Sequence, residues 1–439
     1  MSLILSADFG TSALKISIMD RGLNILDTQK EEYPYILLPG ERVEIAPSAI
    51  INALTATCNK FDKKLREQVS LFCYDSFSPS LMLMNEKGDA LYNIITHMDR
   101  RSREQSKLIC TQFGKERYQQ IAGVYPFTGG VSLTTLLWLM QYEPELTAQT
   151  NKIGHLPTFL HKFFTGIWAI DLVNASMMGL YNTITQSGWS EEILSAFSVS
   201  KDWLSDIHIP GEPLGFLLPD IAEMLALPSG ITVTMGTNDV VAAHAGVGNN
   251  RPGQILNTAG SSDMVSILTD KPVLNPKYYV RNAGKTGLWQ IYATTAGGFA
   301  VDWFCKEFCR EMDKSTFYNQ YLPECLEQNI ETTVSFDPYL AEDRQSLERR
   351  TGAWHGLTLS TTRSQMLASL VCSIQKVLSD TIALAAQQIE IDPIIKITGG
   401  FTDDAILKLK KKMFGNYDFE VLNERTLLGN AIMALENPG

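Results

Sequence analysis

The pattern of apolar and polar positions divides the chain into short apolar strands that alternate with amphipathic helices. The clearest helix lies within residues 363–390, where apolar residues at helical spacing form one buried stripe. The stripe consists of Leu367, Leu370, Val371, Ile374, Val377 and Leu378. An apolar strand, IIKITGG, follows at residues 394–400, and a helix of small residues begins at residue 426. This alternation predicts an α/β protein rather than a β-sandwich.

Two segments far apart in the chain share one pattern of strand, small-residue turn and strand. They read SADFGTSALKISIMD at residues 6–20 and LNTAGSSDMVSILTD at residues 256–270, so a separation of 250 residues aligns Gly10 with Gly260. Each predicts a hairpin whose glycine allows a close backbone approach and whose hydroxyl and amide groups can hold an anion. One such segment alone is most often an ordinary hairpin, but two in register indicate two halves of similar design.

Chain length and breaker residues suggest where the halves divide. A chain of 439 residues exceeds the size at which one hydrophobic core stops growing. The run GNNRPGQ at residues 248–254 is rich in residues that end helices and strands. We therefore expect an N-terminal domain at residues 1–250 and a C-terminal domain at residues 251–439.

Composition excludes several classes of function. Lys and Arg total 37 against 48 Asp and Glu, and the two signs are interleaved, which argues against a nucleic-acid groove. The seven cysteines form no CxxC pair and no Cys/His cluster with zinc spacing, so we expect a reducing compartment. The first residues lack a basic leader and a cleavage site, and no apolar run approaches the roughly 20 residues of a membrane span. These features predict a soluble, cytoplasmic protein.

Two aspartates follow predicted strands where anion chemistry is expected. Asp8 ends the first strand just before the turn at Gly10, and a carboxylate that faces phosphates requires a metal between them. Lys15 either neutralises a phosphate oxygen or is a solvated strand lysine. Asp239 lies where a β-branched strand breaks at Gly236 and a helix of small residues begins. An aspartate there is most often a helix cap, and a catalytic role remains open beside capping.

The motifs together resemble the FGGY family of carbohydrate kinases, which includes xylulokinases, glycerol kinases, gluconokinases and ribulokinases. The resemblance runs almost from end to end. It is carried by DFGTSALK from Asp8, THMDRRS at 96–102, DLVNASMMGLYN from Asp171, GTND ending in Asp239, AGSS from Ala259, TTAGGFAVDW at 294–303, FDPYLAEDR at 336–344 and GGFTDD from Gly399. Each motif is weak alone, but their common order is specific.

This resemblance implies an architecture and an activity. We expect two actin-like, ribonuclease H-like domains with ATP and a sugar in a cleft between them that closes on substrate. The activity would be ATP-dependent phosphorylation of a hydroxyl on a small sugar, ketose or polyol. ATP and Mg²⁺ are the expected cofactors, and a homodimer is open beside a monomer.

The resemblance also implies roles for individual residues. Asp239 would be the general base, and Asp8 and Asp239 would hold Mg²⁺. Phosphate and nucleotide contacts would come from Gly10, Thr11, Ser12, Lys15, Gly260, Ser261, Ser262, Gly298, Asp302, Gly399, Gly400, Phe401 and Asp404, with Phe401 lining the adenine pocket. The sugar would lie near Asp75, Ser78, Pro79, Asp99, Arg101 and Asp239.

Some positions depart from the family pattern. Where xylulokinases carry a Met-His pair this chain has Ser78-Pro79, which argues against xylulose as the substrate. Other departures are His97 for a tryptophan, Thr135 for a lysine and Cys372-Ser373 for a Glu-Gly pair. Two alternatives stay open: an actin-like ATPase without sugar kinase activity, which would not explain the Asp-x-Arg stretch, and a degenerate sugar sensor, which would not explain retention of both Asp8 and Asp239.

Overall fold

A computed structural model describes residues 2–329, 332–340, 343–423 and 425–437 and divides the chain into two compact units. The first unit comprises Met1–Gly248, Arg281–Trp289 and Arg425–Gly439, and the second comprises Asn249–Val280 and Gln290–Glu424. The first division thus falls within the breaker-rich run at residues 248–254. Two later segments belong to the first unit, however, which differs from the expected single boundary at residue 250.

The first unit contains most of the strands and helices. In chain order these are β1 (Leu3–Phe9), β2 (Ala13–Met19), β3 (Ile25–Glu32), β4 (Ile36–Leu38), β5 (Arg42–Ile45), α1 (Pro47–Lys60), α2 (Lys63–Arg66), β6 (Val69–Ser76), β7 (Ser80–Met84), β8 (Ile94–Thr96), α3 (Arg103–Ile109), α4 (Lys115–Ala122), α5 (Ser132–Tyr142), α6 (Pro144–Ala148), β9 (Lys152–Gly154), α7 (Leu156–Thr165), β10 (Ala169–Asp171), α8 (Leu172–Met178), α9 (Glu191–Ala196), β11 (Asp206–His208), β12 (Pro213–Phe216), α10 (Pro219–Met224), β13 (Thr232–Thr234), β14 (Thr237–Asn238), α11 (Asp239–Gly246) and α17 (Thr426–Glu436).

The main sheet of the first unit has the strand order β12-β13-β6-β1-β2-β3, and β14 also pairs with β6. Strand β1 runs antiparallel to β2 and parallel to β6, and β13 and β14 also run parallel to β6. Leu3 and Leu5 belong to the core that includes residues of α1 and α7, whereas Ile4 packs in a cluster with Leu427 of α17. Because successive side chains of a strand point to opposite faces, both faces of this sheet are covered.

The second unit is built around one six-stranded sheet of order β17-β18-β16-β15-β21-β22, in which the end of β17 and the first residue of β18 belong to the Arg281–Trp289 segment of the first unit. Its elements are β15 (Ile255–Ala259), β16 (Ser262–Thr269), β17 (Tyr279–Asn282), β18 (Trp289–Ala296), α12 (Gly298–Phe308), α13 (Lys314–Thr316), α14 (Leu322–Asn329), β19 (Ser335–Asp337), β20 (Ala353–His355), α15 (Arg363–Ala386), β21 (Ile394–Thr398), α16 (Asp404–Phe414) and β22 (Asp418–Val421). Strand β15 runs antiparallel to β16 and parallel to β21, as β1 runs antiparallel to β2 and parallel to β6. The expected pair of matching hairpins is therefore confirmed.

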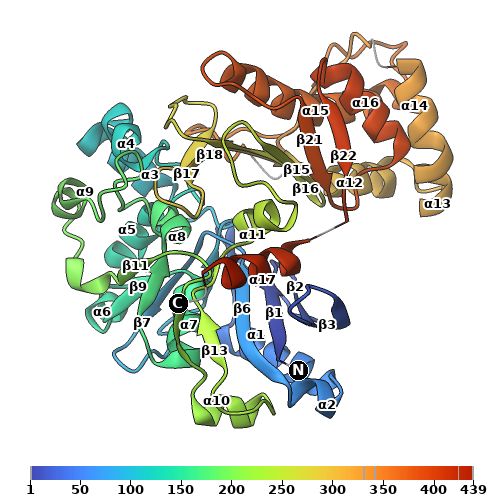
Figure 1. The fold of residues 1–439 in the computed structure, drawn as a ribbon. Helices are drawn as coiled ribbons and strands as arrows, with labels where there is room; N and C mark the ends of the chain where they lie inside the picture. Colours follow the sequence, from blue (N-terminus) through green and yellow to red (C-terminus); the bar gives the residue numbers. More distant parts are fainter. Residues whose placement is uncertain (1, 330–331, 341–342, 424, 438–439) are drawn as a thin grey trace. The chain divides into compact units, whose positions relative to one another are not determined.

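The C-terminal helix α17 belongs to the first unit, whereas a single boundary at residue 250 would assign it to the C-terminal domain. It packs against α11, β1 and β6 of the first unit, as Figure 1 shows. Gly429 of α17 lies so close to α11 that a Cβ there would be 1.7 Å from the carbonyl oxygen of Ala242. The small residues predicted along α11 therefore serve this close helix packing.

Helix α15 is the element predicted from the apolar stripe within residues 363–390. With 24 residues it meets the length and composition of a membrane span, a test that a buried core helix also passes, and 56% of its most apolar window is buried inside the structure. It contributes buried residues such as Leu367 and Leu370 to the core of the second unit.

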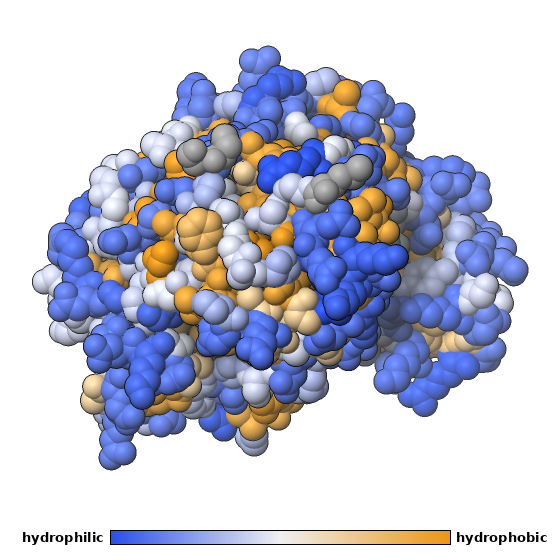
Figure 2. All heavy atoms as spheres, turned by 60° about the horizontal axis from the view of Figure 1, so that its bottom comes forward, coloured by the Kyte–Doolittle hydropathy of each residue, from blue (hydrophilic) through white to orange (hydrophobic). Residues whose placement is uncertain are grey.

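On the face of the molecule drawn in Figure 2, hydrophobic residues are interspersed with hydrophilic ones.

Candidate active site

Three aspartates of the first unit lie at the carboxyl ends of neighbouring parallel strands. Asp8 in β1 is the register partner of Asp75 in β6, and Asp75 is also the partner of Thr237 in β14, two residues before Asp239. Burial raises the pKa of Asp75 well above its usual value, and the nearby charges of Asp8 and Asp239 raise it further. The strand topology thus brings the carboxyl group of Asp75 within electrostatic reach of both Asp8 and Asp239.

Asp239 presents one of its carboxylate oxygens without a hydrogen-bond partner in another residue. Its Oδ1 accepts hydrogen bonds from the backbone N–H of Val240 at 2.8 Å and from Nδ2 of Asn238 at 2.7 Å. Its Oδ2 accepts none from another residue in the described part of the chain. Burial raises its pKa to about 6, and the hydrogen bonds and Arg281 limit the increase. A base with a free oxygen and this pKa is ionised and able to accept a proton at neutral pH.

The helix cap of α11 is Asn238 and not Asp239. The side chain of Asn238 accepts from the backbone N–H of Val240, while Asp239 is the first residue of the helix. The expectation that Asp239 caps the helix is therefore met in part, because Asn238 occupies the N-cap position but Oδ1 of Asp239 accepts from the same N–H of Val240. Oδ2 of Asp239 takes no part in this contact, so a further role for the carboxylate stays open beside capping.

The first glycine turn joins β1 to β2 at residues 10–12. The N–H of Gly10 donates to the carbonyl of Ala13 at 3.0 Å, and Tyr33 donates its hydroxyl to the carbonyl of Gly10. Ser12 is exposed and Thr11 is half-buried. Lys15 is directly opposite Asp8 across the β1–β2 pair, so the two side chains share a face of the sheet. Hydroxyl groups, a lysine and a carboxylate therefore meet at this turn.

In the second unit three predicted nucleotide motifs converge through backbone hydrogen bonds. The N–H of Gly298 donates to the carbonyl of Gly260 at 2.8 Å, and the N–H of Phe401 donates to the carbonyl of Ala259 at 2.8 Å. A Cβ on Gly399 would lie 2.3 Å from that same carbonyl of Ala259. The turn at 260–261, the start of α12 and the glycine pair before α16 thus form one contiguous surface.

The turn of the second hairpin is shorter than the alignment with the first suggests. Ser262 begins β16, whereas Ser12 still lies in its turn. Gly260 does not have a positive φ, and a Cβ there would meet only the carbonyl of Ser262 at 3.6 Å. The backbone conformation and packing at Gly260 therefore do not by themselves require a glycine.

A cavity of about 680 Å³ lies beside the N-terminus of α16. Asp404 lines it together with Thr402 and Tyr318. Asp302 accepts a hydrogen bond from the hydroxyl of Tyr318 at 2.9 Å and forms an ion pair with Lys314. Phe401, by contrast, is 4% exposed and packs in the core of the second unit, so its predicted role as a wall of the adenine pocket is not supported.

The hydroxyl of Ser78, a predicted sugar contact, is held by a chain of side-chain hydrogen bonds. Its Oγ donates to Oδ1 of Asn174 at 2.6 Å, and the same oxygen accepts from Nδ1 of His155 at 2.7 Å. Because burial lowers the pKa of His155 to about 4, the ring is neutral and its Nε2 accepts from the hydroxyl of Ser132. Pro79 follows Ser78 through a cis peptide bond and is buried. The lone pairs of the Ser78 hydroxyl remain available to a ligand.

Asn174 is itself held by the segment that precedes it. Its Nδ2 donates to Oδ2 of Asp171 at 2.5 Å, and Thr237 donates its hydroxyl to Oδ1 of the same carboxylate at 2.9 Å. Asp171 also caps α8. One buried network therefore links Ser78 to the strand-to-helix turn that carries Asp239.

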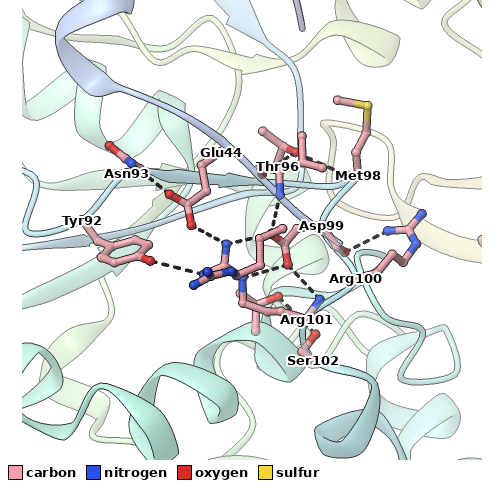
Figure 3. Close-up of polar contacts among 12 residues, drawn as sticks. Glu44, Tyr92, Asn93, Thr96, Met98, Asp99, Arg100, Arg101 and Ser102 are labelled. Carbon is pink, nitrogen blue, oxygen red and sulfur yellow. Dashed lines mark hydrogen bonds and ion pairs between the residues drawn. The ribbon is translucent and has the colours of Figure 1, made fainter. Parts of the chain in front are cut away.

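Asp99 and Arg101 form an ion-paired cluster with each other and do not offer free groups to a sugar (Figure 3). The Arg101 side chain is 2% exposed and contacts both Asp99 and Glu44. Both oxygens of Asp99 are used, by Arg101 and by the backbone N–H of Val43. Arg101 also lies over the ring of Trp138 at 5.0 Å. Their predicted sugar contacts are not supported, because every polar atom has a protein partner.

Asp75 is likewise enclosed. It is fully buried, and its Oδ2 accepts a hydrogen bond from Nδ2 of Asn430 in α17 at 2.5 Å. Its other oxygen, Oδ1, is buried without a hydrogen-bond partner among the described residues, beside Asp8 on the neighbouring strand. Because it is fully buried, the structure gives Asp75 a supporting position rather than a sugar contact.

The departures from the family pattern lie in different surroundings. The ring of His97 packs edge-on against Phe77, next to Ser78. Thr135 is buried beside Ser102, and Ser373 donates its hydroxyl to the carbonyl of Leu370 within α15. His97 and Thr135 thus each contact a residue next to a predicted sugar residue, Phe77 before Ser78 and Ser102 after Arg101.

Arg281, Asn430 and His155 were missed by sequence reasoning. Arg281 belongs to the first unit, donates to the carbonyl of Gly130 and lowers the pKa of Asp239 electrostatically. Arg281 and Asn430 come from segments assigned to the second half, so their partners are remote in sequence. His155 has no second histidine, cysteine or carboxylate at a spacing typical of a ligand set. The only sequence signal near it was the Asp-x-x-Asn segment at 171–174, which contains its partner Asn174.

The residues present fit a magnesium ion that is shared with phosphates. Within the described residues, no group of three or more His, Cys, Asp or Glu side chains is placed to hold a metal alone. Asp8 supplies carboxylate oxygen close to the first glycine turn, and Mg²⁺ is commonly held by one or two carboxylates, waters and substrate phosphates.

Comparisons with known proteins support one family. The profile of the FGGY family of carbohydrate kinases, N-terminal domain, matches residues 3–246. A gluconokinase from Bacillus licheniformis is 24% identical, over 100% of this chain and 88% of the relative. A xylulose kinase from Lactococcus lactis is 25% identical over 78% of this chain and 68% of the relative.

Solved structures share the fold over the whole chain. The structure of ligand-bound xylulose kinase from Lactobacillus acidophilus has a TM-score of 0.90 at 20% identity and covers 100% of this chain and 90% of that one. Plasmodium falciparum glycerol kinase with ADP has a TM-score of 0.86 at 21% identity, with the same coverage. The two units are accordingly actin-like, ribonuclease H-like domains. Since the family profile spans more than half of the sequence, the chain belongs to the FGGY family of carbohydrate kinases, ATP-dependent phosphotransferases with an alcohol group as acceptor.

Proposed function

We propose that this chain transfers the γ-phosphate of ATP to a hydroxyl of a small sugar, sugar acid or polyol, with Asp239 as the general base. The observation that carries this proposal is that the half-buried carboxylate of Asp239, with a pKa of about 6, has an Oδ2 without a partner among the described residues. Asp8, in the strand next to that of Asp75, lies two residues before the first glycine turn, where the phosphates would be held. Gluconokinase, xylulose kinase and glycerol kinase relatives all phosphorylate a hydroxyl.

The reaction balances as one proton transfer and one phosphoryl transfer. Asp239 accepts the proton of the sugar hydroxyl, whose oxygen bonds to the γ-phosphorus while the bond from that phosphorus to the β-phosphate oxygen breaks. The products are a phosphorylated sugar and ADP, and Asp239 later releases its proton to solvent. A bound Mg²⁺ would supply neutralisation of phosphate charge, with Asp8 as its main protein ligand and Asp239 beside it.

Nucleotide binding is assigned to both glycine turns. Gly10, Thr11, Ser12 and Lys15 would contact phosphates from the first unit. From the second unit the phosphate and nucleotide contacts would come from Gly260, Ser261, Ser262, Gly298, Gly399 and Gly400. The adenine would occupy the cavity lined by Asp404, and Asp302 would act through Tyr318.

On the sugar side, Ser78 and Pro79 would contact the substrate, and Asp75, Asp99 and Arg101 would support the site from behind. Since Ser78-Pro79 replaces a Met-His pair, xylulose is not expected to be the best substrate. The seven cysteines are free thiols, which supports a cytoplasmic location. A homodimer remains a prediction that light scattering tests.

A coupled ADP-release screen tests the proposal. The panel should contain ketopentoses, ketohexoses, heptuloses, aldonates, polyols and glycerol. ADP release that depends on one of these compounds supports a kinase, whereas hydrolysis that responds only to added protein partners supports an actin-like ATPase. Sugar binding without any ADP release would identify a sensor, and xylulose as the preferred substrate would contradict the reading of Ser78-Pro79.

A further inference from the structure

Four polar side chains form a cluster in the interior of the second unit. They are Lys410 of α16, Gln375 of α15, Asn257 of β15 and Asp263 of β16, and all four are fully buried. None is among the residues assigned to nucleotide contacts above, although Asn257 and Asp263 lie in the strands of the second hairpin and Lys410 lies on the helix that follows the Gly399–Gly400 pair. Buried charged groups need such complete pairing, because an unpaired charge in the interior is costly.

The cluster is satisfied at its charged centre. The Lys410 ammonium donates to Oδ1 of Asn257 at 2.8 Å, to Oδ2 of Asp263 at 3.0 Å and to Oε1 of Gln375 at 2.6 Å. These contacts use all the donors of an ammonium group. Asp263 also accepts from Nδ2 of Asn257 at 2.6 Å and from Nε2 of Gln375 at 3.1 Å. Each residue therefore fixes the orientation of the others.

The position of the cluster connects two parts of the candidate nucleotide site. Asp263 directly follows Ser262 and pairs with Ala259, so it lies at the base of the phosphate turn. Lys410 lies on α16, whose first residue, Asp404, lines the 680 Å³ cavity. The ion pair between Asp263 and Lys410 thus joins the hairpin that would hold the phosphates to the helix that would flank the adenine.

Stability alone does not account for this arrangement. A buried ion pair often contributes no more to stability than well-packed apolar residues of the same volume, since desolvation offsets the attraction. A hydrogen-bonded charge pair adds geometric specificity. Its hydrogen bonds form only when the elements that carry the two charged groups have one relative position. Here that placement sets the spacing between the phosphate turn and α16.

We infer that Lys410 is a positioning residue for nucleotide binding, which holds α16 in register with the Gly260–Ser262 turn through Asp263, Asn257 and Gln375. The inference rests on the proposed function for the nature of the ligand. Lys410 touches no substrate and acts by keeping the adenine and phosphate contacts at the spacing that one nucleotide spans.

Lys410→Met tests the inference, because methionine keeps most of the length of the side chain and removes its charge. Lys411→Met is the matched control, since Lys411 is on the same helix but is 68% exposed in its ion pair with Asp418. ADP affinity should be measured by calorimetry with Mg²⁺, well below the melting temperature of each variant. At that temperature a loss of stability alone leaves ADP affinity unchanged.

We expect ADP affinity to fall about tenfold in Lys410→Met, roughly the value of one well-formed hydrogen bond, and to stay unchanged in Lys411→Met. Unchanged affinity in folded Lys410→Met would overturn the inference and leave the proposed function intact. Absence of ADP binding by the wild-type protein would instead overturn the proposed function. If Lys410→Met does not fold, Gln375→Met decides, because it removes only neutral hydrogen bonds, and unchanged ADP affinity in that variant overturns the inference.

Discussion

Asn238 caps helix α11 and at the same time donates a hydrogen bond of 2.7 Å from its Nδ2 to Oδ1 of Asp239. The two tasks that the sequence left open at Asp239 are therefore divided unequally between two neighbours. Both side chains accept a hydrogen bond from the backbone N–H of Val240, whereas only Asp239 has a carboxylate oxygen, Oδ2, without a partner among the described residues.

This division predicts the behaviour of Asp239→Asn. Turnover should fall by roughly 10² to 10⁴, the usual cost of losing a general base. ADP affinity should stay near that of the wild-type protein, because the nucleotide motifs lie elsewhere. Steady-state assays at saturating sugar and calorimetry with ADP measure the two effects. Near-normal turnover in a folded variant would show that Asp239 is not the base.

The raised pKa of Asp239 predicts two pH profiles. Because the base must be ionised, kcat/KM should decline as pH falls below about 6. The folded state binds this proton more tightly than the unfolded chain, whose value is near 3.8, so the ionised group costs stability as pH rises through this window. Asp239→Asn should therefore melt above the wild-type protein at pH 8, and the difference should vanish near pH 4. A melting difference that is independent of pH would contradict the assigned pKa.

Ser78→Ala tests the sugar side. The substitution removes a hydroxyl that Asn174 and His155 hold in place, so KM for the sugar should rise about tenfold, as expected for one lost hydrogen bond. KM for ATP should not change. His155→Phe should reproduce part of this effect without touching a ligand. Equal changes in both KM values would point to a general disturbance of the first unit.

Gly260→Ala and Gly260→Val test the second turn. Since a Cβ at this position has 3.6 Å to the nearest backbone atom, both variants should fold. ADP affinity should fall in Gly260→Ala and more strongly in Gly260→Val, because the side chain blocks the approach of phosphate to the backbone. Calorimetry and thermal melts separate the effects, and full ADP affinity in folded Gly260→Val would remove this turn from the site.

Arg101→Met tests whether the cluster of Figure 3 is structural. The change leaves Glu44 and Asp99 buried without their cation and should cost about 3–5 kcal/mol in the free energy of unfolding. Arg103→Met is the control, since its ion pair with Glu41 is partly exposed and should contribute at most about 1 kcal/mol. Urea denaturation measures both. Similar stabilities for the two variants would contradict the structural role.

The sequence by itself determined the local elements and the ligand-facing turns. The apolar stripe at 363–390, the hairpins around Gly10 and Gly260 and the strand-to-helix turn at Asp239 depend on residues close in sequence, so their spacing was enough to predict them. The order of these motifs then indicated the family, and with it the chemistry expected of Asp8 and Asp239.

Only the tertiary structure decided what surrounds those elements. It placed α17 and Arg281 in the first unit, enclosed Asp75, Asp99 and Arg101 among protein partners, and joined Lys410 to Asp263 across 147 residues of sequence. The physical reason is that burial and pairing of polar groups are properties of contacts between distant segments. An aspartate that binds a ligand and one that neutralises a buried arginine read identically in the sequence, and their partners alone distinguish them.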